Sequence, residues 1–309
     1  MDKISIVIPC FNEENNIPLI YSAINKVFEN GISAEYELIF VDDGSKDNTL
    51  KVLRDLSATD QKVKYISFSR NFGKEAALYA GIKNATGDFV AVMDADMQDP
   101  PELLCDMYKE IKTGEFDCIA ARRVDREGEP KIRSLFARAF YKLINKVAEV
   151  QLVDGARDFR LMNKKYVDAL LELSEYNRFS KGLFDWVGFK TKWIEYKNVE
   201  RRSGKTKWSF WKLFKYSVNG IVAFSSLPLY ICSLLGITMC AVSFLAILFI
   251  IFRQLIFGGS VAGWPSLVCI IVLIGGLLML GIGILGFYLS KIYLEVKNRP
   301  IYISREEKL

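Results

Sequence analysis

The chain of 309 residues contains no histidine. This absence excludes Ser-His-Asp triads, Cys-His pairs and every metal site that depends on imidazole ligands. Cysteine is scarce as well: the six cysteines show no C-x-x-C spacing, so we expect neither disulfides nor a zinc site. Any acid–base or metal chemistry in this protein must therefore use carboxylates.

Charge is missing from two long stretches near the C-terminus. No charged residue lies between Lys215 and Arg253, and none lies between Arg253 and Lys291. Each gap exceeds the ~20 apolar residues that span a bilayer. The sequence therefore predicts two transmembrane helices, at roughly 227–252 and 265–289.

Positive charge flanks the two predicted helices on one side only. The loop from Gln254 to Gly263 carries no charge, whereas Lys and Arg stand before the first helix and after the second. The positive-inside rule then places both termini in the cytoplasm of a multi-pass membrane protein. Met1-Asp2-Lys3 leads directly into a strand-like segment instead of a cleavable leader, so the first two thirds should remain cytosolic.

A G-x-G-x-x-G motif is also missing after the first predicted strand, Ile4–Pro9. This absence argues against a Rossmann dinucleotide site, in which those glycines let the pyrophosphate approach the backbone. Further strands are predicted at 37–41, 63–68, 89–93 and 117–123, with helices between them. This alternation indicates an α/β fold with a largely parallel sheet, whose ligands bind outside the carboxyl ends of the strands.

An acidic segment directly follows the fourth predicted strand. Asp94 and Asp96 follow the apolar run Phe89–Met93, and Asp99 comes shortly after them. On extended backbone, residues two apart leave the same face, so both side chains should converge on one divalent cation, which Asp99 is placed to join. A Mg²⁺ or Mn²⁺ held by one or two carboxylates keeps positions open for phosphate oxygens. The alternative is an Asp-rich turn that caps the next helix.

Four motifs follow one another along the chain: I-V-I-P-C-F-N-E-E-N, V-D-D-G-S-K-D-N-T, R-N-F-G-K-E-A-A-L and D-A-D-M-Q-D-P-P-E. Together they resemble the family 2 inverting glycosyltransferases. Within that family they are most similar to the polyprenyl-phosphate group, which contains the dolichyl-phosphate mannose synthases and the bacterial bactoprenol glucosyltransferases. The resemblance covers the whole chain. It implies a nucleotide-sugar-binding α/β domain of the GT-A type, with a mostly parallel sheet and helices on both faces.

The resemblance implies a metal-dependent, inverting transfer of a single hexose from a UDP-sugar, with glucose favoured, to a membrane polyprenyl (undecaprenyl) phosphate. The product would be a lipid-linked sugar for cell-envelope glycosylation, made at the bacterial inner membrane with Mg²⁺ or Mn²⁺. No nucleic-acid partner is implied, and the glycine-rich second span leaves a homo-oligomer open. The alternatives are a non-catalytic membrane module that binds nucleotide-sugar, and a processive polysaccharide synthase, whose Q-x-x-R-W motif this chain lacks.

The resemblance also implies roles for individual residues. Those expected to line the nucleoside pocket are Pro9, Asn12, Glu13, Asp42 and Asp43. Asp94 and Asp96 would hold the metal on the diphosphate, near Gln98, which makes Asp96 a catalytic residue as well. Asp158, just before Phe-Arg-Leu, matches the catalytic base of the family. Because a phosphate acceptor is largely a dianion at neutral pH, Asp158 either deprotonates it or only orients it.

Basic side chains are expected to bind the phosphates of both the donor and the acceptor. Arg178 and Lys181 belong to a stretch that resembles the part of the family that closes over the donor phosphates, although many relatives have arginine where this chain has Lys181. Lys74 is either a diphosphate contact or a solvated surface lysine. The residues expected to bind the acceptor phosphate are Arg201, Arg202, Lys205 and Lys207, in a strongly basic segment beside the first predicted membrane helix. The alternative reading of these four is a topology signal only.

These interpretations divide the chain into a cytosolic head, a basic linker, a membrane hairpin and a tail. The expected bounds are 1–200 for the glycosyltransferase domain (nucleotide-sugar half 1–110, acceptor half 111–200), 201–226 for the juxtamembrane segment, 227–290 for the hairpin and 291–309 for the cytosolic tail. Within the acceptor half, apolar and basic residues alternate at helical spacing from 131 to 147. This pattern predicts an amphipathic helix that packs on the core or lies in the membrane interface.

Overall fold

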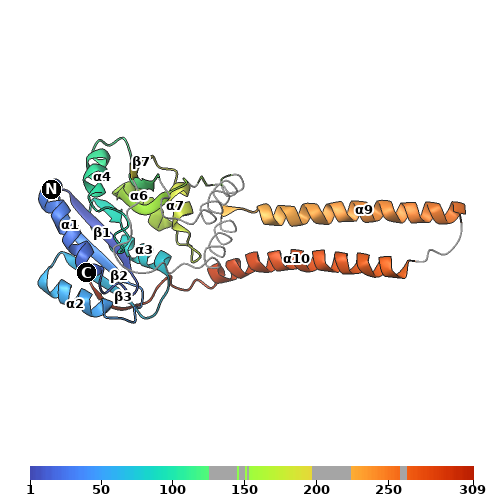
Figure 1. The fold of residues 1–309 in the computed structure, drawn as a ribbon, viewed down its shortest axis with the longest axis horizontal. Coiled ribbons are helices and arrows are strands. Elements are labelled where there is room, and N and C mark those ends of the chain that lie inside the picture. Colours follow the sequence, from blue (N-terminus) through green and yellow to red (C-terminus); the bar gives the residue numbers. More distant parts are fainter. Residues whose placement is uncertain (125–144, 146–149, 152, 197–223, 258–262) are drawn as a thin grey trace.

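The structure is a computed structural model that describes residues 1–124, 145, 150–151, 153–196, 224–257 and 263–309. Figure 1 shows a layered α/β head from which two long helices project side by side. These helices are α9 (Leu227–Phe257) and α10 (Trp264–Val296). Both ends of the chain lie on the head, because the segment after α10 returns to it (Figure 1).

The described residues of the head form one eight-stranded sheet. Its strands are β1 (Lys3–Cys10), β2 (Glu35–Asp42), β3 (Val63–Phe68), β4 (Phe89–Val92), β5 (Cys118–Arg123), β6 (Ala156–Asn163), β7 (Thr191–Tyr196) and β8 (Ser304–Lys308). Their order is β7-β5-β6-β4-β1-β2-β3-β8. β1 pairs in parallel with β2 and β4, β2 with β3, and β5 with β7, whereas β6 and β8 run antiparallel to their neighbours. The mostly parallel sheet expected from the sequence is confirmed.

Helices cover both faces of the sheet. On one face lie α1 (Ile17–Gly31), α2 (Thr49–Thr59) and α4 (Leu103–Ile111), and on the other α3 (Lys74–Lys83), α6 (Lys164–Glu172) and α7 (Ser180–Trp186). In β1, Ile4, Ile6 and Ile8 pack with the first set of helices, and Val7 packs with the second. A strand buried on both faces carries no polar side, which is why the parallel strands read as continuous apolar runs.

Close packing of α3 on the sheet depends on Gly81. A Cβ atom at this position would lie 2.1 Å from Cγ1 of Val7, closer than two carbon atoms can approach. The missing side chain therefore lets α3 lie directly on β1. Because α3 begins at Lys74, this packing brings the Lys74 side chain to the carboxyl ends of the parallel strands.

Three strands of the sheet, β6, β7 and β8, were not predicted from the sequence, and of these β7 pairs in parallel with β5. β6 inserts antiparallel between β4 and β5, and it carries Asp158. β8 follows α10 in the chain and pairs antiparallel with β3 at the edge of the sheet. The segment 291–309, expected only as a cytosolic tail, therefore contributes a strand to the head.

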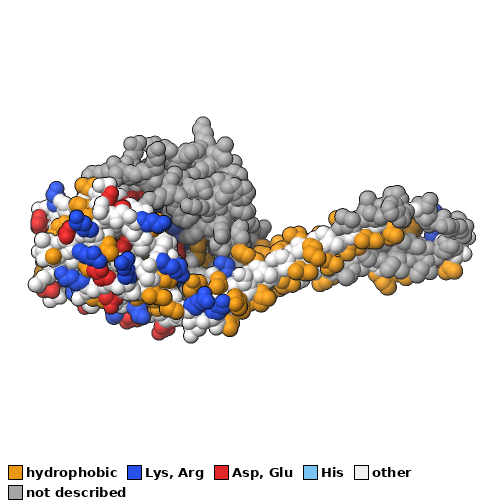
Figure 2. Space-filling model, turned by 90° about the horizontal axis from the view of Figure 1, so that it is seen from below, with side chains coloured by type: hydrophobic (Ala, Val, Ile, Leu, Met, Phe, Trp, Pro, Cys, Tyr) orange, Lys and Arg blue, Asp and Glu red, His pale blue; other side chains and the backbone are white. Residues whose placement is uncertain are grey.

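Both predicted C-terminal helices are present, and both are longer than expected. Figure 2 shows hydrophobic side chains along the described parts of the projecting pair, in contrast to the mixed charges of the head. Among the described residues one segment, Leu273–Val296 of α10, is long and apolar enough to cross a membrane, and Leu227–Met239 of α9 is a shorter apolar segment. One candidate span is thus shown, and the second span stays a prediction.

Two basic segments of the sequence analysis lie outside the described residues. These are the amphipathic helix predicted from 131 to 147, apart from Asn145, and the linker up to residue 223. The four cations expected to bind the acceptor phosphate, Arg201, Arg202, Lys205 and Lys207, all belong to this linker.

Candidate active site

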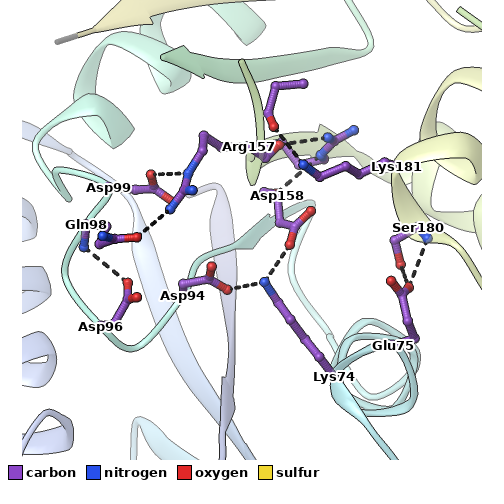
Figure 3. A network of polar contacts seen from close by, with 12 residues as sticks. Lys74, Glu75, Asp94, Asp96, Gln98, Asp99, Arg157, Asp158, Ser180 and Lys181 are labelled. Carbon is purple, nitrogen blue, oxygen red and sulfur yellow. Dashed lines mark hydrogen bonds and ion pairs between the residues drawn. The ribbon is translucent and has the colours of Figure 1, made fainter. Parts of the chain in front are cut away.

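The polar turns predicted to form a site do meet at one edge of the sheet. β1, β2 and β4 run parallel and adjacent, so their carboxyl ends open on the same side. Asp94 follows the end of β4, and Asp42 closes β2. Two further groups reach this edge: Lys74 from the start of α3 and Asp158 from β6 (Figure 3).

Lys74 bridges two carboxylates at the centre of this edge. Its Nζ atom lies 2.6 Å from Oδ1 of Asp94 and 2.5 Å from Oδ2 of Asp158 (Figure 3). The sequence analysis offered a diphosphate contact or a solvated surface lysine, and in this structure Lys74 is instead an internal ion-pair partner. It joins the acidic turn after β4 to the residue matched to the catalytic base.

These ion pairs shift the pKa values of Lys74 and Asp158. Burial favours the uncharged form of each group. For Asp158, the positive charges of Lys74 and then of Lys181 have the larger effect, and they hold its carboxyl pKa below the ordinary value. For Lys74 burial likewise works against the charge, yet Asp158 and then Asp94 raise its pKa above the ordinary value. Lys74 and Asp158 are therefore both charged at neutral pH, and Asp158 is a weak base as long as Lys74 holds it.

Asp94 and Asp96 do not share one face of an extended strand, contrary to the expectation from their spacing. β4 ends at Val92, and the chain then turns, with a positive φ of 58° at Met97. Asp94 points to Lys74, whereas Oδ1 of Asp96 accepts a hydrogen bond from the Gln98 backbone N–H at 3.2 Å (Figure 3). Both remain on the same short turn at the mouth of the sheet.

The donor set at this turn nevertheless fits a hard divalent cation. The described residues contain no cluster of three or more Asp, Glu, Cys or His side chains arranged to hold a metal. Mg²⁺ and Mn²⁺ at nucleotide sites, however, need only one or two carboxylates, because water and phosphate oxygens supply the other ligands. The Asp94 side chain is 23% exposed, so a ligand at the mouth can reach its carboxylate.

Asp99 was considered as a third ligand, and the structure gives it another role. Its side chain is 2% exposed, and Oδ1 accepts hydrogen bonds from Arg157 Nε (2.8 Å) and from the Tyr196 hydroxyl. Arg157 also donates to Oε1 of Gln98 at 3.3 Å (Figure 3). This network fastens the acidic turn to β6 and β7. Sequence reasoning missed Arg157, although its position directly before Asp158 was a signal.

Residues predicted for the nucleoside pocket stand at the ends of β1 and β2. Pro9 lies in β1. Asn12 has a positive φ of 55°, and its side chain accepts a hydrogen bond from the Lys46 backbone N–H at 2.8 Å. Glu13 accepts one from the Asn16 amide at 2.6 Å. The Asn12–Lys46 contact fixes the turn after β1 against the turn after β2, and the Glu13–Asn16 contact holds the first turn itself in shape.

The carboxyl groups of Asp42 and Asp43 are buried and bound to the chain itself. Asp42 accepts hydrogen bonds from the Ser45 backbone N–H (2.9 Å) and the Ser67 hydroxyl (2.8 Å). Asp43 accepts them from the backbone N–H groups of residues 72 and 73. Burial raises the pKa of Asp43 to about 6 despite these hydrogen bonds. The structure thus shows both residues holding loops in place, and their contact with a nucleoside stays a prediction.

Lys181 and Arg178, expected together over the donor phosphates, have different surroundings. Lys181 donates to the backbone oxygen of Ala156 at 3.1 Å and adds positive charge near Asp158. Arg178 lies over the ring of Tyr79 on α3, 4.7 Å from its centre, and donates to the backbone oxygen of Leu173. Of the two, Lys181 therefore belongs to the Asp94–Lys74–Asp158 cluster, and Arg178 lines a cavity that also includes Lys74.

Comparison with known proteins agrees with this arrangement. Residues 5–171 match the family described as glycosyl transferase family 2. The putative glycosyltransferase CsbB of Bacillus subtilis is 46% identical, with 99% of this chain and 92% of that protein covered. The prophage bactoprenol glucosyl transferase homolog of Escherichia coli is 41% identical, with 99% of each chain covered.

A solved structure shares the fold at low identity. Mannosyl-3-phosphoglycerate synthase from Rubrobacter xylanophilus superimposes with a TM-score of 0.52 and 17% identity, over 71% of this chain and 72% of that one. At this identity the likeness concerns the fold alone. It supports the GT-A type of α/β head expected from the sequence.

Proposed function

The chain is a family 2 glycosyltransferase of the polyprenyl-phosphate group, and from this premise we propose that it moves a single hexose from a UDP-sugar to undecaprenyl phosphate. Glucose is the proposed hexose, because several relatives are named bactoprenol glucosyl transferases. The proposed product is a lipid-linked sugar for cell-envelope glycosylation.

The bridge made by Lys74 is the observation that carries this proposal. It holds together the turn proposed to bind the donor, at Asp94, and the residue proposed to face the acceptor, Asp158. A transferase must hold two substrates with their reacting atoms in contact, and fixed charges shared between the two binding regions serve that purpose. A module that only binds nucleotide-sugar has no need of Asp158 at this position.

A divalent cation, Mg²⁺ or Mn²⁺, is the proposed cofactor. Asp94 and Asp96 are the residues that would hold it. When bound, it would neutralise negative charge on the departing UDP. Lys74 and Lys181 add fixed positive charge at the same edge, in a partly buried setting where such charge acts strongly.

The acceptor needs little help to become a nucleophile. A phosphate monoester has a second pKa near ~6, so it is largely a dianion at neutral pH. In the proposed step, an acceptor phosphate oxygen attacks the anomeric carbon from the side opposite UDP, and the bonding electron pair leaves with UDP. Because Lys74 holds the pKa of Asp158 low, we assign Asp158 the role of orienting Lys74 and the acceptor, and not that of removing a proton.

The membrane arrangement completes the proposal. We propose that α9 and α10 form a two-helix hairpin in the bacterial inner membrane, with the head and both termini in the cytoplasm. The uncharged stretches of the sequence and the apolar segment Leu273–Val296 support this topology. The basic segment with Arg201, Arg202, Lys205 and Lys207 would then lie at the headgroup level, where anionic lipids attract it.

The experiment that tests the proposal measures UDP release by the full chain in detergent or vesicles that contain undecaprenyl phosphate. We expect release that depends on the lipid and on UDP-glucose, together with a glucosylated lipid product. UDP-sugar binding without lipid-dependent release would instead show a non-catalytic module. Release with lengthening of a polysaccharide product would show a processive synthase.

A further inference from the structure

A cavity of about 570 Å³ is lined in part by Lys74 and by none of the residues of the acidic turn. Its walls come from the start of α3, from residues 175–179 and from the C-terminal end of α10. It is therefore the place where the candidate membrane span, Leu273–Val296, meets the head. Lys74 belongs both to this cavity and to the Asp94–Asp158 cluster.

One wall of the cavity is apolar and continues from α10. It is formed by Phe179, Phe224, Tyr288 and Ile292. Phe179 and Phe224 contact one another with ring centres 6.0 Å apart, and the Tyr288 hydroxyl donates to the backbone oxygen of Ser225 at 2.6 Å. Because Tyr288 and Ile292 lie one turn apart on the candidate span, an apolar chain leaving the membrane along α10 meets this wall first.

Arg178 also lines the cavity. Its Nε atom is buried and has no hydrogen-bond partner among the described residues. Glu175 and Glu75 favour its positive charge through space, but neither accepts a hydrogen bond from Nε. Burial lowers its pKa from the ordinary value. A buried N–H donor without a partner is costly, and an anion in the cavity would supply the missing acceptor.

Three glutamates also line the cavity, and two of them are bound to the chain. Glu295 accepts hydrogen bonds from the backbone N–H groups of Tyr176 and Asn177, at 3.0 and 3.1 Å. Glu75 accepts two from Ser180. Burial raises the pKa of Glu75 and that of Glu175. The bound carboxyl groups of Glu295 and Glu75 brace the cavity, and none of the three glutamates accepts a hydrogen bond from Nε of Arg178.

We propose that this cavity binds the phosphate-bearing end of the polyprenyl acceptor, with Arg178 on the phosphate and the Phe179–Phe224–Tyr288–Ile292 wall on the first isoprene units. The inference rests on the proposed function, since it locates the acceptor of that reaction. It also replaces the sequence-based assignment of Arg178 to the donor phosphates. Lys74 then borders both substrates, because it lines the proposed acceptor cavity and its Nζ atom reaches Asp94 and Asp158 at the donor site.

The test titrates each substrate in turn against the full-length Arg178→Gln variant, reconstituted in vesicles. One titration varies undecaprenyl phosphate at saturating UDP-glucose, and the other varies UDP-glucose at saturating lipid. Loss of a charge-assisted phosphate contact should raise the acceptor KM roughly ten- to hundredfold and change the donor KM less than about twofold. Arg305→Gln is the matched control, because Arg305 is exposed on β8, and both of its KM values should equal those of the wild type.

A second pair of variants tests the apolar wall without touching Arg178. Ile292→Trp adds bulk inside the cavity, whereas Leu289→Trp adds the same bulk on a 66% exposed side chain of α10 that does not line the cavity. Only Ile292→Trp should raise the acceptor KM. Equal effects of the two variants would contradict the proposed isoprene contact.

The outcomes separate this inference from the function on which it rests. If the wild type transfers no sugar to undecaprenyl phosphate, the proposed function fails. If the wild type is active and Arg178→Gln raises the donor KM alone, Arg178 is a donor contact and the cavity assignment is wrong. If Arg178→Gln changes neither KM, the acceptor binds elsewhere. UDP binding to each variant, measured by calorimetry, confirms that the head is folded.

Discussion

The charged groups near the acidic turn and those near α10 differ in whether the chain itself supplies their partners. On the side of the acidic turn, Lys74 is ion-paired with both Asp94 and Asp158, and Arg157 is ion-paired with Asp99. On the side of α10, Arg178 keeps a buried Nε without a partner beside an apolar wall. The first side is held in shape by the chain alone, and the second is complete only with an anion that carries an apolar tail. Substitutions should therefore affect the two substrates differently.

The largest effect is expected on the acidic side. Asp96→Asn should lower kcat by roughly a hundred- to a thousandfold, because a carboxylate proposed to hold the divalent cation loses its charge. The acceptor KM should change little. Initial rates with and without EDTA measure the effect, and Asp106→Asn, an exposed change on α4, is the control. Wild-type turnover in EDTA would remove the metal from the proposal.

The second-largest effect is expected from substitution of Lys74, which bridges Asp94 and Asp158. Lys74→Met should lower kcat roughly a hundredfold, since it removes charge that both sides share. It also releases Asp158, whose pKa should rise relative to the wild type, because burial is then opposed only by the charges of Lys181 and Arg160. A carboxylate with a raised pKa becomes protonated at higher pH, so the acidic limb of the kcat profile should move to higher pH.

Rates between pH 5 and pH 8 measure that shift. Lys83→Met is the matched control, because Lys83 is exposed in the last turn of the same helix. Lys74→Arg keeps the charge and should restore the wild-type profile in part. An acidic limb that stays in place in Lys74→Met would show that Asp158 is not held by this lysine during turnover.

A smaller effect is expected from Glu295→Gln, on the α10 side. This change weakens the contacts that tie α10 to residues 176 and 177 and so loosens one wall of the cavity. The acceptor KM should rise about three- to tenfold, whereas the donor KM should not change. Glu307→Gln, on the exposed face of β8, provides the comparison. A rise in the donor KM would mean that the two sides are coupled more tightly than the structure indicates.

The smallest effect is expected at the far edge of the sheet. Glu306→Gln removes the carboxylate that pairs with Arg54 and accepts the Tyr65 hydroxyl. Because this pair is largely exposed, both KM values and kcat should stay at wild-type levels, and the melting temperature should fall only slightly. A kinetic effect would show that β8 influences the site.

Sequence reasoning located the parallel strands and the acidic turn because both depend on local patterns. Apolar runs that end in Asp or Asn mark buried strands and their carboxyl ends. β6 was missed because Ala156–Asn163 carries three charged side chains, and its place in the sheet is set by β4 and β5 on either side. β8 was missed because Ser-Arg-Glu-Glu-Lys contains no apolar residue, and only its pairing with β3 makes it a strand.

The role of Lys74 could not be predicted for a related reason. Its partner Asp158 is 84 positions away in the chain, and no periodicity connects them. The resemblance named Asp158 and left Lys74 open, because a motif gives the residue type and not its contacts. Arg178 was assigned to the donor because its stretch resembles the part of the family that closes over the donor phosphates, and the sequence alone does not show that α10 returns to the head beside it.

The position of β8 in the chain has a consequence for biosynthesis. This strand is translated after α9 and α10, yet it pairs with β3, which is translated long before them. Until residues 304–308 have left the ribosome, the backbone of β3 presents an unpaired edge that can associate with other strands. With the proposed topology, the sheet is completed only when both helices have entered the bilayer and the last residues are back in the cytoplasm. A chain whose hairpin inserts incompletely would keep its β3 edge open, which would make it a substrate for chaperones and proteases.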